Sequence, residues 1–68
     1  MNRLIETFLA EDSIGSQYRI EHYQKITKHK HLIRRGESTY QRRGSTVHYE
    51  GDDLFLIVTL DTEVKRLR

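Results

Sequence analysis

The chain has 68 residues, with 12 Lys or Arg, 10 Asp or Glu, no cysteine, no proline and a formal net charge of +2. This length predicts one domain over residues 1–68, with a small core and a narrow margin of stability. The lack of cysteine excludes disulfides and zinc sites built on Cys ligands, so stability has to come from packing and, as we expect, from self-association.

The first predicted element is an amphipathic helix over residues 2–11. Its apolar residues occur at positions i, i+1, i+4 and i+5, namely Leu4, Ile5, Phe8 and Leu9. Asn2 is a plausible N-cap, and the residues 13–16 contain the Gly and Ser that end a helix. Because the apolar runs here are no longer than three residues, we expect no signal peptide, no membrane span and a cytoplasmic location.

The middle of the chain is rich in Tyr, Ile and Thr, which favours a strand over Gln17–Gln24. The segment Lys25–Arg35 fits a strand and a helix equally well, and this alternative stays open. A short strand is predicted over Thr39–Arg42, followed by a turn at Arg43-Gly44.

The C-terminal half predicts a β-hairpin. Residues Ser45–Glu50 alternate between apolar and polar, and the run Leu54–Leu60 has six apolar residues of seven. Gly51-Asp52-Asp53 is typical of the turn between two such strands. We expect Leu56 and Val58 to be buried in a central strand on which Phe8 packs, and the last residues to form an edge strand or a helical turn.

Together these elements predict an α+β fold, in which an N-terminal amphipathic helix packs on a small antiparallel sheet of three to five strands. The sheet can close into a small barrel. A strand that is apolar on both faces needs two covers, and the helix supplies one. If the barrel does not close, a second subunit has to supply the other, so we expect a homodimer or larger homo-oligomer.

Charge is unevenly distributed along the sequence. The segment Lys25–Arg43 holds seven Lys or Arg and one acid, whereas the rest of the chain holds five basic and nine acidic residues. Such a layout favours a nucleic-acid or other polyanion partner. The predicted binding residues are Lys25, Lys28, Lys30, Arg34, Arg35, Tyr40, Arg42 and Arg43. The alternative is a small regulatory or inhibitory protein that docks on an acidic surface of a partner protein.

Other chemistries have weaker support. His29 and His31, with His22 and His48, are the residue types of a metal site, but the neighbouring lysines repel cations and no zinc spacing is present. The sequence also lacks a nucleophile motif, a phosphate loop and a dinucleotide fingerprint. We therefore expect no metal, no cofactor and no enzymatic activity.

Overall fold

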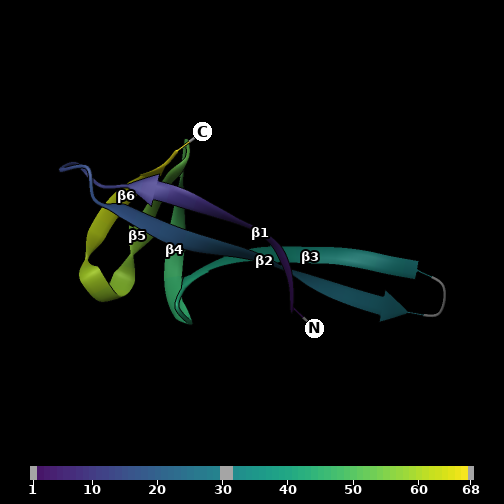
Figure 1. Cartoon of the computed structure of the whole chain (residues 1–68). Coiled ribbons are helices and arrows are strands. Elements are labelled where there is room, and N and C mark those ends of the chain that lie inside the picture. Colours follow the sequence, from purple (N-terminus) through teal and green to yellow (C-terminus); the bar gives the residue numbers. More distant parts are fainter. Residues whose placement is uncertain (1, 30–31, 68) are drawn as a thin grey trace.

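The computed structural model describes residues 2–29 and 32–67, and within them the regular structure consists of six β-strands and one short 3-10 helix. The elements are β1 (Asn2–Glu11), β2 (Gln17–His29), β3 (Leu32–Arg42), β4 (Ser45–Gly51), β5 (Leu54–Ile57), η1 (Val58–Leu60) and β6 (Thr62–Arg66). Each strand pairs antiparallel with the next, and β6 returns to β1, so the sheet closes into a barrel (Figure 1).

The barrel closes along a short seam between the two ends of the chain. Ala10 pairs with Arg66 and Glu11 with Lys65, and the amide of Leu67 donates a 2.8 Å hydrogen bond to the carbonyl of Leu9. The C-terminal segment is thus a strand with neighbours on both sides, rather than the edge strand or helical turn that the sequence left open.

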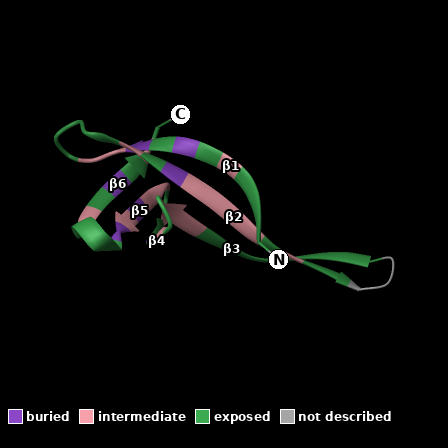
Figure 2. Cartoon of the chain, turned by 60° about the horizontal axis from the view of Figure 1, so that its bottom comes forward, coloured by how far each residue is buried: buried purple, intermediate pink, exposed green. Residues whose placement is uncertain are grey.

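The core fills the inside of the barrel. It is built from seven buried side chains: Phe8, Ala10, Ile20, Val47, Phe55, Ile57 and Val64. They come from every strand except β3, which contributes the half-buried Tyr40. Figure 2 shows the buried residues confined to the barrel, whereas the far ends of β2 and β3 are exposed.

The predicted N-terminal helix is wrong, because this segment forms strand β1, paired with β2 along its length. A register shift between Leu4 and Glu6 inserts one extra residue, Ile5, into the strand. Such a bulge changes the phase of the alternation, so apolar residues on its two sides take on a helix-like spacing. Of the apolar stripe only Phe8 is buried, and it alternates with the buried Ala10 as in a strand.

The predicted central strand and its core residues also need correction. The strand ends at Ile57, and Val58–Leu60 form η1, which is followed by Asp61 in the left-handed region at a φ of 49°. Val58 is 45% exposed and Leu56 is half-buried. Side chains alternate along β5, and those of Phe55 and Ile57 point into the barrel and are buried, whereas Leu54 and Leu56 are half-buried.

The predicted hairpins are confirmed. β4 pairs with β5 from Val47↔Ile57 to Gly51↔Leu54, and β3 pairs with β4 through Tyr40↔Val47. The β3–β4 connection is a two-residue turn in which Arg43 and Gly44 have φ values of 51° and 81°. Positive φ at both central residues matches the right-handed twist of the strands.

The α+β class is therefore replaced by an all-β barrel, and the expected three to five strands become six within the described residues. The undecided segment Lys25–Arg35 belongs to β2 and β3 where the structure describes it. Since the closed barrel covers its own apolar side, the core no longer requires a second subunit. The homodimer remains a prediction, but the need to cover an apolar face of the sheet no longer supports it.

Replacing Ile57 by alanine should destabilise the barrel by about 2–5 kcal/mol, because the deletion leaves a cavity at a fully buried site. Leu56→Ala is the matched control, because it truncates the half-buried neighbour on the same strand and should cost clearly less. Urea unfolding followed by circular dichroism measures both. An equal or larger loss for Leu56→Ala would contradict the inward direction assigned to Ile57.

Candidate functional site

Strands β2 and β3 are longer than the strands beside them. β2 has 13 residues and β3 has 11, whereas β4 has 7. β1 accompanies β2 only as far as Lys25, and β4 pairs with β3 only from Tyr40 onward. The ladder of residues 26–29 and 32–35 therefore leaves the barrel as a two-stranded ribbon, here called the arm (Figure 1). With the arm the molecule measures 49 Å along its longest axis, against 23 and 17 Å across.

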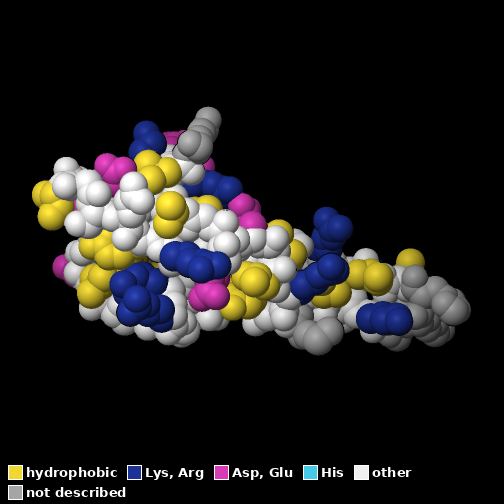
Figure 3. Space-filling view, in the orientation of Figure 1, with side chains coloured by type: hydrophobic (Ala, Val, Ile, Leu, Met, Phe, Trp, Pro, Cys, Tyr) yellow, Lys and Arg dark blue, Asp and Glu magenta, His cyan; other side chains and the backbone are white. Residues whose placement is uncertain are grey.

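The arm presents cations on both of its faces. Directly paired residues share a face of the ribbon, and the register pairs Lys28 with Ile33. Arg35 belongs to the same face by alternation, whereas Arg34 belongs to the opposite one. Figure 3 shows Lys and Arg side chains spaced along the arm between hydrophobic ones. All three cations are exposed.

These cations have no carboxylate partners in the part of the chain that the structure describes. Both ion pairs found there involve Glu6 of the barrel, with His22 and Arg66 as its partners. The guanidinium and ammonium groups of Lys28, Arg34 and Arg35 are therefore open to an external anion.

The structure separates the predicted binding residues into groups. Lys25 lies exposed at the base of the arm, opposite Asn2, and Lys28, Arg34 and Arg35 lie on the arm itself. Arg42 and Arg43 lie at the β3–β4 turn of the barrel, where the Arg42 guanidinium is 5.2 Å from the ring centroid of Tyr18. Lys30 and His31 fall outside the described residues.

Tyr40, also predicted to bind, packs with the core. Its ring centroid lies 4.9 Å from that of Phe55 and 6.3 Å from that of Phe8, both in edge contacts, and it stacks on the His22 ring at 4.7 Å. Burial raises the pKa of the Tyr40 hydroxyl. One ring face of Tyr40 is thus occupied by the imidazole, which leaves it poorly placed to stack on a base.

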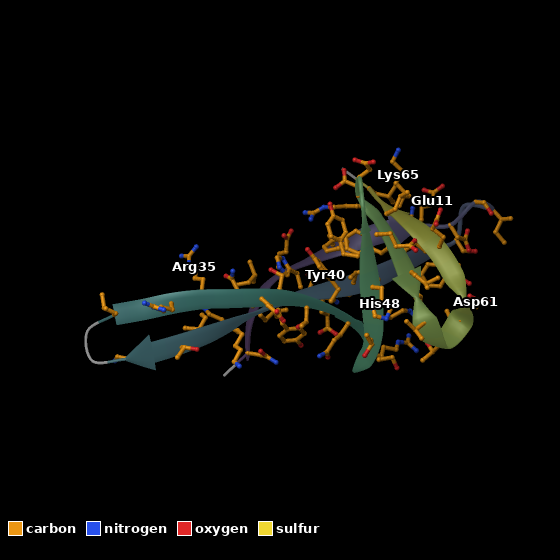
Figure 4. The ribbon with its side chains drawn as sticks, turned by 180° about the vertical axis from the view of Figure 1, so that it is seen from behind. Glu11, Arg35, Tyr40, His48, Asp61 and Lys65 are labelled. Atoms are coloured by element: carbon orange, nitrogen blue, oxygen red, sulfur yellow. The ribbon has the colours of Figure 1, made fainter. Side chains whose placement is uncertain are left out.

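A cleft opens where β3 and β4 separate. Their ladder ends at Tyr40↔Val47, and residues on both sides of that pair line a cleft of about 680 Å³. Figure 4 labels Tyr40 of β3 and His48 of β4, on opposite sides of the β4 ribbon. The polar side chains of the cleft are those of Asn2, Ser38, Thr39, Gln41, Thr46 and His48, and its exposed ring is that of Tyr49.

The sequence did not identify this cleft as a site. Its residues come from three strands, and a scattered set of Ser, Thr, Asn and Gln has no recognisable spacing. Tyr49, a tyrosine shortly after the basic segment, was the one visible signal. In the structure it is 55% exposed.

A polar cluster ties the barrel together beside the cleft. Arg66 donates a 2.5 Å hydrogen bond to Glu6, and the Nδ1 of His22 lies 3.3 Å from the other Glu6 oxygen. The Arg66 guanidinium also lies 4.2 Å from the ring centroid of Phe8. Hydrogen bonds to Arg66 and then to His22 lower the pKa of Glu6. Since these residues come from β1, β2 and β6, the cluster fixes the seam of the barrel.

The acids gather on the barrel. The charged residues that line a groove on it are Glu11, Asp12, Asp61, Glu63 and Lys65, and Figure 4 shows Glu11 and Asp61 on the side of the barrel away from the arm. Within residues 2–29 and 32–67, no group of three or more His, Cys, Asp or Glu could hold a metal ion. Nor does that part of the chain contain a helix long and apolar enough to cross a membrane.

Glu6→Gln should make the stability of the protein less sensitive to acid. Because the folded-state pKa of Glu6 is lowered, its contribution is present above the unfolded value near 4.5 and is lost as the pH falls through the folded-state pKa. Thermal melts between about pH 5 and pH 2 should therefore show a smaller fall in Tm for Glu6→Gln than for wild type. Glu37→Gln, at an exposed position of β3, is the control. Equal pH dependence of Glu6→Gln and wild type would contradict the assigned cluster.

The geometry thus offers two adjoining features with different chemistry, a cationic arm and an uncharged cleft with an exposed aromatic ring at its base. Compared with known proteins, the chain matches no protein-family model, no curated protein and no solved structure.

Proposed function

We propose that this protein is a nucleic-acid-binding module that contacts phosphates with its arm and acts by binding rather than by catalysis. The observation that carries the proposal is the arm itself, a projecting ribbon whose cations have no carboxylate partner among the described residues. A phosphate backbone is a dense row of negative charges, so clustered Lys and Arg bind it without special geometry.

The two-faced distribution of charge supports a partner that surrounds the arm. A flat acidic surface would contact one face of the ribbon and leave Arg34, or else Lys28 and Arg35, in solvent. A looped strand or a nucleic-acid groove has phosphates on two sides, and a two-stranded ribbon is thin enough to lie between them. This arrangement favours nucleic acid over the alternative, an acidic protein surface.

The shape of the molecule supports the same function. The groove with four acids lies on the side of the barrel away from the arm, so a polyanion is attracted to the arm more strongly than to that groove. Such separation of charge orients a charged partner as it approaches. The barrel then serves as the rigid base that presents the arm.

The test is the salt dependence of binding to a fluorescein-labelled DNA stem-loop, measured by fluorescence anisotropy between about 50 and 200 mM salt. Log affinity should fall linearly with log salt. The slope should become shallower by about 0.7–0.9 for each cation whose phosphate contact is removed, in Lys28→Ala, Arg35→Ala and Arg34→Ala alike. We expect the shallower slope for variants on both faces of the arm, that is, for Arg34→Ala as well as for Lys28→Ala and Arg35→Ala.

Lys65→Ala is the matched control, because it removes one exposed positive charge from β6, on the side of the barrel away from the arm. It should leave the slope unchanged. If Lys65→Ala and the arm variants change the slope equally, the binding depends on net charge and the arm is not the site. If no binding to the stem-loop occurs at about 100 mM salt, the proposed nucleic-acid binding is wrong, and an acidic surface of a partner protein becomes the favoured ligand of the arm.

A further inference from the structure

The cleft at the base of the arm differs in chemistry from the arm. Its lining contains amides, hydroxyls, the His48 imidazole and the rings of Tyr40 and Tyr49, and no Lys, Arg, Asp or Glu among the residues described there. A phosphate would find no cation inside it. The cleft instead suits a neutral ligand that carries hydrogen-bonding groups.

Tyr49 provides a flat apolar surface at this cleft. Its ring is packed against Phe55, at 5.1 Å between centroids, and against Tyr40, at 5.8 Å. The residue is nevertheless 55% exposed, so much of it remains open. A ring held from behind loses little freedom when a second ring stacks on its open side, which favours binding of a planar aromatic ligand.

The polar groups around Tyr49 complement the edge of such a ligand. Ser38 shares the face of Tyr40 and Tyr49 by strand alternation, and its hydroxyl both donates and accepts. Asn2 also lines the cleft, and its amide offers two donors and an acceptor. A nucleobase is a neutral, planar aromatic group whose edge carries both donors and acceptors. Among the parts of a nucleic acid, the base therefore fits the cleft and the phosphate fits the arm.

The cleft and the arm adjoin through one residue pair. Asn2 lines the cleft and is the direct cross-strand partner of Lys25, at the base of the arm. Directly paired Cα atoms lie about 4.5–5.5 Å apart in an antiparallel ladder. A Lys side chain can bridge the remaining distance, so a base in the cleft has a cation beside it for its own phosphate.

From these observations we infer that the cleft binds an unpaired nucleobase stacked on Tyr49, next to the phosphates held by the arm. This inference rests on the proposed function and narrows its ligand to single-stranded or looped nucleic acid. In an uninterrupted duplex each base is stacked on both faces and its pairing edge is occupied, so it cannot enter the cleft without leaving the helix.

The experiment compares binding of a fluorescein-labelled single-stranded DNA and of the same sequence as a fully paired duplex. Wild type should prefer the single strand. Tyr49→Ala should weaken single-strand binding about 5- to 100-fold, the effect of losing one stacked base. Tyr49→Phe keeps the ring and should stay within about threefold of wild type. Because stacking releases no counterions, the salt slope of Tyr49→Ala should equal that of wild type.

Two further variants keep the test decisive. Tyr49→Leu retains an apolar side chain against Phe55 but has no ring to stack, so it should lose single-strand affinity even if Tyr49→Ala proves too unstable to measure. Ile14→Ala removes an apolar side chain at the β1–β2 turn that is still more exposed than Tyr49, at 85%, and should bind as wild type does.

The inference is overturned if Tyr49→Leu binds the single strand as tightly as wild type, or if the Tyr49 variants weaken single-strand and duplex binding equally. In either case, loss of affinity in the arm variants would still support the proposed function. Absence of binding to both DNAs by wild type would remove the proposed function and this inference together.

Discussion

The structure depends on a mismatch in strand length. A barrel of this size can pair only part of β2 and β3, because β1 and β4 stop accompanying them at Lys25 and Tyr40. The unpaired remainder has to leave the barrel, and it does so as a ribbon held by the β2–β3 ladder alone. An isolated two-stranded ribbon is only marginally stable in water, so the barrel that anchors it is a condition for its existence. The cleft arises from the same mismatch, since it lies where β3 turns away from β4.

Closure of the barrel explains how so short a chain supports this extension. The seam is only two residue pairs long, but the Glu6–Arg66 hydrogen bond and the Arg66–Phe8 contact hold the same strands together. With its ends joined, the sheet buries seven apolar side chains and presents no open edge along the seam. The seam and the core contain none of the arm cations, which leaves the arm and the exposed side of Tyr49 available for a partner.

The sequence predicted the parts of this fold that depend on local signals. The turns at Arg43-Gly44 and Gly51–Asp53 contain Gly44, Gly51, Asp52 and Asp53, types that tolerate positive φ, so both hairpins were predicted correctly. The N-terminal helix was predicted because a bulge at Ile5 gave a strand the spacing of a helix. The strand over Leu54–Leu60 was predicted too long because an apolar run cannot show where a chain turns. The arm stayed undecided because an exposed ribbon has no buried face to impose a two-residue period. The composition of the segment was enough to predict that the arm is basic. Which cation lies on which face of the arm could be assigned only from the β2–β3 pairing register.

We propose that the arm and the cleft at its base together form one nucleic-acid-binding surface. A titration of the ¹⁵N-labelled wild-type protein with an unlabelled DNA stem-loop, followed by two-dimensional NMR, tests this directly. Amide shifts should move most at Lys28, Arg34 and Arg35 on both arm strands and at Thr39 and Tyr49 in the cleft. Shifts confined to one face of the arm, or centred on the acidic groove around Asp12 and Glu63, would contradict it.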